Sequence, residues 1–249
     1  MGIFTLFIGS LFNSWPQIIT TFNTSEPFYN QVFRTFGFGA IYALIRSAIV
    51  ALVVALTLGI KHRYTLYNKI SSLFTGLCLG TFIAGLQATL SYFGPSLEPL
   101  WADYTALGNY FPIIAPTITA LTKLTFASSL FLLLCTAIDQ WTSGFTRNRF
   151  IGAFVLIIFT LIVTGLQMPT DYTFWVISGI ILGTVITILY AFIIHFDHTV
   201  IPLIVGITTI AGLAQQAVFN AYPMALVAHL FASIFVLSIS VLWWKQLNK

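Results

Sequence analysis

The sequence predicts an all-α membrane protein, a polytopic bundle of about seven transmembrane helices. Apolar runs recur along the chain, and each is near the roughly 20 residues that a helix needs to cross a hydrocarbon core of about 30 Å. Hydrophobic residues make up 58% of the chain and charged residues only 6%, too apolar a composition for one soluble core. The runs are apolar on all sides, which excludes the alternating strands of a membrane barrel.

Seven runs qualify as spans, and we expect them to form one membrane domain over residues 36–249. In chain order they are Phe36 to Ile60, Ser72 to Phe93, Ile113 to Ile138, Phe150 to Gln167, Phe174 to Ile194, Ile201 to Phe219 and Met224 to Trp244.

Residues 1–35 form a separate N-terminal segment, which we interpret as interfacial or re-entrant. Met1 to Phe12 is too short to span a bilayer alone, and the Trp15-Pro16 pair interrupts the apolar pattern beyond it. The alternative is an eighth span, which would move the N-terminus to the inner side. The segment lacks the basic leader and cleavage site of a signal peptide.

The cations between the spans predict the orientation of the chain. Seven of them follow odd-numbered spans, whereas Arg34 alone lies on the other side; the seven are Lys61, Arg63, Lys69, Arg147, Arg149, Lys245 and Lys249. The positive-inside rule therefore places the N-terminal side of the first span outside and the C-terminus in the cytosol.

Small residues recur every fourth position in the first two spans. They are Gly39, Ala43, Ser47, Ala51, Ala55 and Gly59 in the first, and Gly76, Gly80, Ala84 and Ala88 in the second. Because such residues let two backbones approach closely, we expect these two spans to pack together. Each step of four residues turns the stripe by about 40° around the helix. The stripe of the first span therefore faces more than one neighbouring helix. Alternatively, Gly and Ala are simply common in membrane helices.

Two cations lie inside predicted spans. Arg46 and Lys123 both fall roughly 15 Å below the outer face, at a cost of about 2.5–3.5 kcal/mol each. Their candidate partners are backbone carbonyls, lipid phosphates reached by snorkelling, a bound anion, or Glu98 and Asp103 of the long outer loop.

Further polar residues share the outer half: Gln87, Gln215, Gln216 and His229. With the two cations, they could line an outward cavity for a carboxylate or phosphate. Each alone is more typical of interhelical hydrogen bonding or snorkelling, which is the interpretation we favour.

At the inner face, His195, Asp197 and His198 follow the fifth span, with His62 and Asp139 on neighbouring inner loops. Their spacing matches no established metal motif, so we expect a hydrated helix end and no metal or cofactor. Cys78 and Cys135 lie within apolar runs, where we interpret them as packing residues. The thinly spread cations form no basic patch, so we expect lipid and no nucleic acid as a partner.

The chain from Trp15 onward resembles part of the long bacterial CAAX-protease and bacteriocin-processing (CPBP) family of intramembrane metalloproteases. The resemblance lies in G-P-S-L-E-P-L-W-A-D-Y at Gly94 to Tyr104, D-Q-W-T-S-G-F-T-R-N-R at Asp139 to Arg149, and the closing A-Y-P-M-A-L to W-W-K-Q-L. The part matched is similar to the region downstream of the catalytic module. It implies a multi-pass protein of the bacterial inner membrane.

The catalytic elements of that family are missing. The sequence has no E-E-x-x-x-R element and no F-x-x-x-H element, and His229 is followed at the fourth position by Ser233. The resemblance therefore implies a noncatalytic region, an internal fragment or split-gene product that packs against a catalytic module or a substrate helix. The alternative is a small transporter or lipid- or anion-binding protein that uses Arg46 and Lys123.

Overall fold

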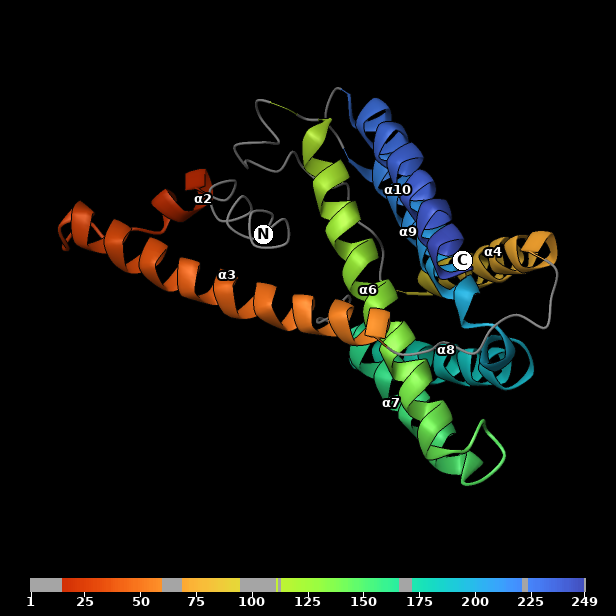
Figure 1. Ribbon diagram of the computed structural model, residues 1–249. Helices are drawn as coiled ribbons and strands as arrows, with labels where there is room; N and C mark the ends of the chain where they lie inside the picture. Colours follow the sequence, from red (N-terminus) through yellow and green to blue (C-terminus); the bar gives the residue numbers. More distant parts are fainter. Residues whose placement is uncertain are drawn as a thin grey trace.

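The structure is a computed structural model of the chain, and it describes residues 15–59, 69–94, 111, 113–165, 172–220 and 224–248. Within these ranges every helix or strand assigned is a helix, so the predicted all-α class is confirmed (Figure 1). The elements are α2 (Trp15–Thr20), α3 (Phe28–Gly59), α4 (Lys69–Tyr92), α6 (Ile114–Trp141), α7 (Arg149–Gly165), α8 (Tyr172–Phe192), the 3-10 turns η1 (Ile194–Phe196) and η2 (His198–Val200), α9 (Ile201–Phe219) and α10 (Ala225–Leu247).

Six of the described helices are long and apolar enough to cross a membrane: α3, α4, α6, α8, α9 and α10. By length and composition, the chain is thus a multi-pass membrane protein. The helix α7 coincides with the predicted fourth span but has only 17 residues. At 1.5 Å per residue it reaches about 25 Å, short of a hydrocarbon core of about 30 Å. A seventh crossing therefore stays a prediction.

The helix α3 begins at Phe28 rather than at Phe36, where the first span was predicted to start. Pro27 precedes it, which suits a helix start, and the Gln31 amide bonds back to the backbone N–H and carbonyl of Asn23, each at 2.7 Å. The polar first turns are compatible with a helix, although hydropathy alone excluded them from the span. The division at residue 35 thus falls inside α3, and residues 1–14 lie outside the described ranges.

The centre of the molecule is formed by α6, α9 and α10, which contact one another pairwise. One buried cluster, with Leu124, Leu213 and Val236, lies between these three helices. A larger cluster joins α4, α6, α7, α8 and α9 and includes Leu132 and Tyr190. Because lipid is as apolar as these side chains, close packing rather than exclusion from water holds such helices together.

The predicted pairing of the first two spans is wrong. Within the described residues, α4 packs along α9, whereas α3 lies across α6 (Figure 1). A Cβ atom added at Gly76 would lie 2.9 Å from Cβ of Leu203, and one added at Gly80 would lie 2.7 Å from Cβ of Ile207. The small residues of α4 do allow a close approach, but a stripe of this kind does not specify which helix approaches.

The helices α7 and α8 also approach each other closely at small residues. Added Cβ atoms at Gly179 and Gly183 would lie 3.2 Å from the Cα of Leu161 and 2.9 Å from the Cα of Ile157, respectively. The indole N–H of Trp175 also donates to the carbonyl of Leu161 at 2.6 Å. The two helices therefore form a closely packed antiparallel pair.

Candidate functional site

Buried and partly buried polar side chains gather where the ends of several helices meet. We call this group the polar node and define it by Ser72, Asp139, Tyr190, His195, Asp197, His198, Thr199 and Trp244. They come from the start of α4, the ends of α6, α8 and α10, and the two 3-10 turns between α8 and α9. The N-terminal ends of α4 and α9 thus meet the C-terminal ends of α6, α8 and α10, as antiparallel neighbours require. Which side of the membrane this is stays a prediction.

Asp197 organises one half of the node. Its Oδ1 accepts hydrogen bonds from the backbone N–H of Thr199 at 2.9 Å and from Thr199 Oγ1 at 2.6 Å. Its Oδ2 accepts from Oγ of Ser72 at 2.7 Å, and that oxygen accepts in turn from the indole N–H of Trp244 at 3.2 Å. Asp197 therefore caps η2 and also joins α4 and α10 to the start of α9.

Asp139 organises the other half. The Tyr190 hydroxyl donates a short hydrogen bond to Oδ1 of Asp139, and it also lies 3.3 Å from the carbonyl oxygen of Cys135. Nε2 of His198 lies 3.2 Å from Oδ2 of Asp139, an ion-pair distance without the alignment of a hydrogen bond. These contacts join α6, α8 and η2. Nδ1 of His198 is buried and has no hydrogen-bond partner among the described residues.

His195 lies beside this second half. Its Nδ1 is 3.2 Å from the carbonyl oxygen of Tyr190, and its ring packs against Phe196. The tight turn from α8 into η1 produces both contacts, because it folds the imidazole back onto the helix it has just left.

The expectation of a hydrated helix end is wrong. His195, Asp197 and His198 are only 9%, 3% and 1% exposed, respectively. The predicted fifth and sixth spans left only residues 195–200 between them, and so short a connection keeps its side chains against the helix ends. The short connection was therefore the sign of burial in the sequence. The partners Ser72 and Trp244 could not be identified from the sequence, because they lie far from this connection along the chain.

The described residues contain no group of three or more His, Cys, Asp or Glu side chains arranged to hold a metal ion. His62, the remaining member of the predicted inner set, lies outside the described residues. The acids of the node contact hydroxyl, backbone N–H and imidazole groups.

The predicted outer set is not joined in the described part of the chain. Gln87, Lys123, Gln215 and Gln216 are exposed on α4, α6 and α9. His229 is instead buried, with Nδ1 2.6 Å from the Ala225 carbonyl oxygen and Nε2 3.3 Å from the Asn220 amide. The Arg46 side chain, Glu98 and Asp103 lie outside the described residues. The anion site thus stays a prediction, and His229 has a local packing role.

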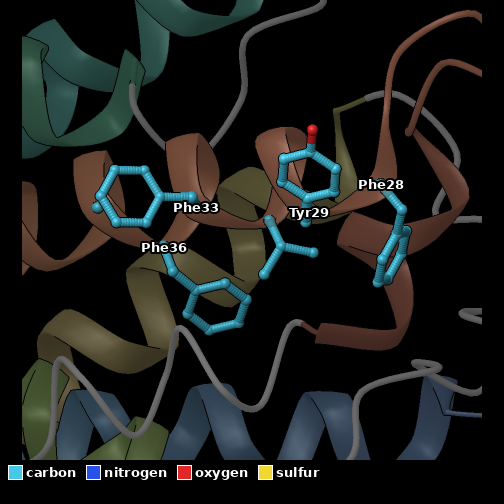
Figure 2. Close-up of a pocket in the computed structure, with 6 residues that line it drawn as sticks. Phe28, Tyr29, Phe33 and Phe36 are labelled. Atoms are coloured by element: carbon cyan, nitrogen blue, oxygen red, sulfur yellow. The ribbon is translucent and has the colours of Figure 1, made fainter.

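A shallow hollow of about 580 Å³ lies along the first turns of α3. Figure 2 shows Phe28, Tyr29, Phe33 and Phe36 around it, and the Tyr29 hydroxyl is the one side-chain polar group among the six lining residues. The hollow is open and apolar, which suits contact with lipid rather than chemistry.

The six long apolar helices define a multi-pass helical membrane protein. Comparison with known protein families, curated proteins and solved structures finds no match to this chain.

Proposed function

We propose that this chain is a noncatalytic domain of the bacterial inner membrane that packs against the catalytic module of a CPBP-type intramembrane protease. The proposal combines the resemblance in the loop and span patterns with the position of α3. Of the two occupants that the resemblance implies, a catalytic module suits a rigid helical surface better than a transient substrate helix does.

The observation that carries the proposal is how little of α3 is covered by the other described helices. This helix has 32 residues, yet Ala43 and Ser47 are its only buried side chains among those described. The one close helical neighbour of α3 in the described structure is α6. In Figure 1 the N-terminal part of α3, with α2 beside it, projects away from α4 and from α6 to α10.

The small-residue stripe continues beyond the crossing with α6. Ala51 and Ala55 are exposed, one and two steps further along α3. Small exposed residues allow a second helix to approach closely, and such packing is a main source of association within lipid. This surface therefore suits a membrane helix from another protein.

The polar node supports a noncatalytic role. Its two carboxylates contact groups of the same chain, and its side chains are buried except for that of Asp139, which is partly buried. An acid or base that acts on a substrate must reach it within hydrogen-bond distance. Groups that hold helix ends together, as these do, leave such chemistry to another module.

Coexpression tests the proposal. The partner is a protein with the E-E-x-x-x-R element encoded beside this chain, and the two should copurify from a mild detergent as a stoichiometric complex. The double substitution Ala51→Leu with Ala55→Leu should abolish copurification, because two larger side chains hold the partner helix away. Ala214→Leu, the same change at an exposed position on α9, is the matched control and should leave the complex intact.

Two results would contradict this function. One is a complex unaffected by the double substitution on α3. The other is cleavage of a prenylated peptide by the isolated chain, reconstituted with a divalent metal, since that would make the chain an enzyme by itself.

One observation favours the rival function, a transporter or anion-binding protein. The Lys123 side chain is exposed on α6, although it lies well inside a predicted membrane span. A cation facing lipid at that depth is costly unless it snorkels or faces water. An aqueous path beside α6 would account for its position, and replacement of this lysine distinguishes the two functions.

A further inference from the structure

The first turns of α3 have an apolar and a polar face. The residues that line the shallow hollow follow one another at helical spacing and share one face: Phe28, Tyr29, Val32, Phe33, Phe36 and Gly37 (Figure 2). At 100° per residue, Gln31 and Arg34 fall on the opposite face. This end of α3 is therefore amphipathic, and such a helix places its apolar face against an apolar neighbour.

The amphipathic turns extend beyond the hydrocarbon core. The 32 residues of α3 form about 48 Å of helix at 1.5 Å per residue. Even at a tilt of about 40°, a core of about 30 Å takes up only about 39 Å of helix. The polar residues Asn30, Gln31 and Arg34 identify the N-terminal turns as the part that enters the interface.

Large side chains are exposed in these turns. Tyr29 and Phe33 are 71% and 82% exposed, respectively. Two kinds of apolar occupant suit the hollow that they line, a lipid chain or an apolar stretch of protein. Water reaches the interface, and there the hydrophobic effect favours covering such rings, whereas it does not act among lipid tails. The depth of the hollow therefore favours protein.

The chain ahead of α3 is held against the same turns. The ring of Phe22 packs against that of Phe28 with centroids 5.6 Å apart, and the side-chain amide of Gln31 bonds twice to the backbone of Asn23. In Figure 1, α2 lies beside this end of α3. Residue 12 is three positions before α2, a reach of at most about 11 Å. So short a connection costs little loop-closure entropy.

The sequence ahead of α2 has a matching apolar face. Residues 1–14 lie outside the described structure, but their pattern is clear: the spacing i, i+3, i+4, i+7 and i+8 is occupied by Phe4, Phe7, Ile8, Leu11 and Phe12. A helix over residues 4–12 would extend about 12 Å, and the lining residues span about 14 Å of α3. The segment and the hollow thus agree in length and polarity.

We propose that the segment Met1 to Phe12 folds back along the first turns of α3 as an interfacial helix and fills the hollow with its apolar face. The contact goes beyond the packing function proposed above and does not depend on it, because Ala51 and Ala55 lie near the other end of α3. The segment then lies along the membrane surface and does not form an eighth span.

Disulfide crosslinking in native membranes tests the proposal. The full chain, without Cys78 and Cys135, carries Ile8→Cys together with Val32→Cys, and mild oxidation should join the two within one chain. Arg34→Cys replaces Val32→Cys as the matched control on the opposite face of α3, and its disulfide should form at least tenfold more slowly. Failure of denatured protein to react with maleimide-polyethylene glycol measures the disulfide.

Three results would overturn the contact. They are no disulfide at position 32, equal rates at positions 32 and 34, and a crosslinked dimer, which would assign the hollow to a second copy of the chain. An eighth span predicts the first of these, because it would carry residue 8 away from α3.

A protection assay needs only one cysteine and does not rely on oxidation. The thiol of Val32→Cys should react slowly with a water-soluble maleimide while the segment covers it. Phe7→Asp, which places a charge on the apolar face of the segment, should speed the reaction at least tenfold. Asn13→Asp adds the same charge on the other side of that helical pattern and should leave the rate unchanged. Equal rates in the two variants would refute the proposal, because lipid rather than the segment would then cover position 32.

Discussion

The indole N–H of Trp244 donates a hydrogen bond to the hydroxyl of Ser72, although the two residues are 172 positions apart in the chain. The bond joins the end of α10 to the start of α4, and the same hydroxyl continues the contact to Asp197. Three helices that the sequence separates widely thus share one chain of hydrogen bonds. Such a chain is worth more to stability than an isolated pair, because its members polarise one another.

Substitution of Trp244 by Phe should destabilise the protein modestly. The ring volume is largely kept, but the hydrogen bond to Ser72 is lost, at a cost of about 1 kcal/mol. Thermal unfolding in detergent measures the change. Trp141→Phe is the control, because Trp141 is exposed and should be replaced without effect. Equal stability of the two variants would show that the bond contributes nothing.

Alanine substitutions of two glycines in α4 should have opposite effects. An added methyl group at Gly80 would lie 2.7 Å from Cβ of Ile207, so Gly80→Ala forces α4 and α9 apart at a cost of about 1–3 kcal/mol. At Gly85 an added methyl group meets nothing within 4 Å, and alanine is the better helix former by about 1 kcal/mol. Unfolding midpoints of the two variants measure the difference. If Gly80→Ala were as stable as Gly85→Ala, the close packing of α4 on α9 would be wrong.

Cysteine labelling should locate the two ends of the bundle. Ser71 and Ser143 are both exposed and lie at the start of α4 and just beyond the end of α6, so cysteines placed there should react from the same side. The positive-inside rule makes that side the cytosol, and a cysteine at Ser96 should react from the opposite side. The measurement uses an impermeant maleimide on cells and on inverted vesicles, in a background without Cys78 and Cys135. Labelling of Ser71 and Ser143 from opposite sides would refute the predicted topology.

Replacement of Lys123 by Leu separates the two proposed functions. If Lys123 only snorkels to the interface, the variant should insert at least as well, because a cost of about 2.5–3.5 kcal/mol is removed. If an anion site uses it, binding of a phosphate or carboxylate probe to reconstituted protein should be lost. Arg46→Leu should give the same result as Lys123→Leu, whether that is better membrane insertion or loss of anion binding. Calorimetry with inorganic phosphate measures binding, and membrane yield measures insertion.

The sequence predicts the helices well and their neighbours poorly. The predicted span Ile201 to Phe219 has the same ends as α9, because hydropathy changes abruptly there and Pro202 suits the first turn. The start of α3 is missed because hydropathy reports immersion in lipid, whereas a helix can begin earlier among polar residues. The packing of α4 on α9 rather than on α3 depends on the shapes of side chains that are far apart in the chain. The spacing of small residues along one helix carries no information about those shapes.

The same reasoning explains the candidate sites. The signal in the sequence is local: His195, Asp197 and His198 stand close together and are visible as a group. Their burial depends on Ser72, Asp139 and Trp244, which come from three other helices. For the outer set, equal depth left a shared cavity open as the alternative to interhelical bonding, but depth says nothing about the direction in which each side chain points around its helix.

The double role of Asp197 makes the reversal between α8 and α9 a poor place for added sequence. The same carboxylate that shapes the turn at Thr199 also holds Ser72, so any extra residue there would displace both contacts together. Residues 146–148 are a better place for a tag or a fluorophore, because they are exposed and the hydrogen bonds of Thr146 and Arg147 reach only Thr142 and Ser143, whereas Phe145 before them packs against Tyr190. A reporter placed there would leave the interior of the protein untouched.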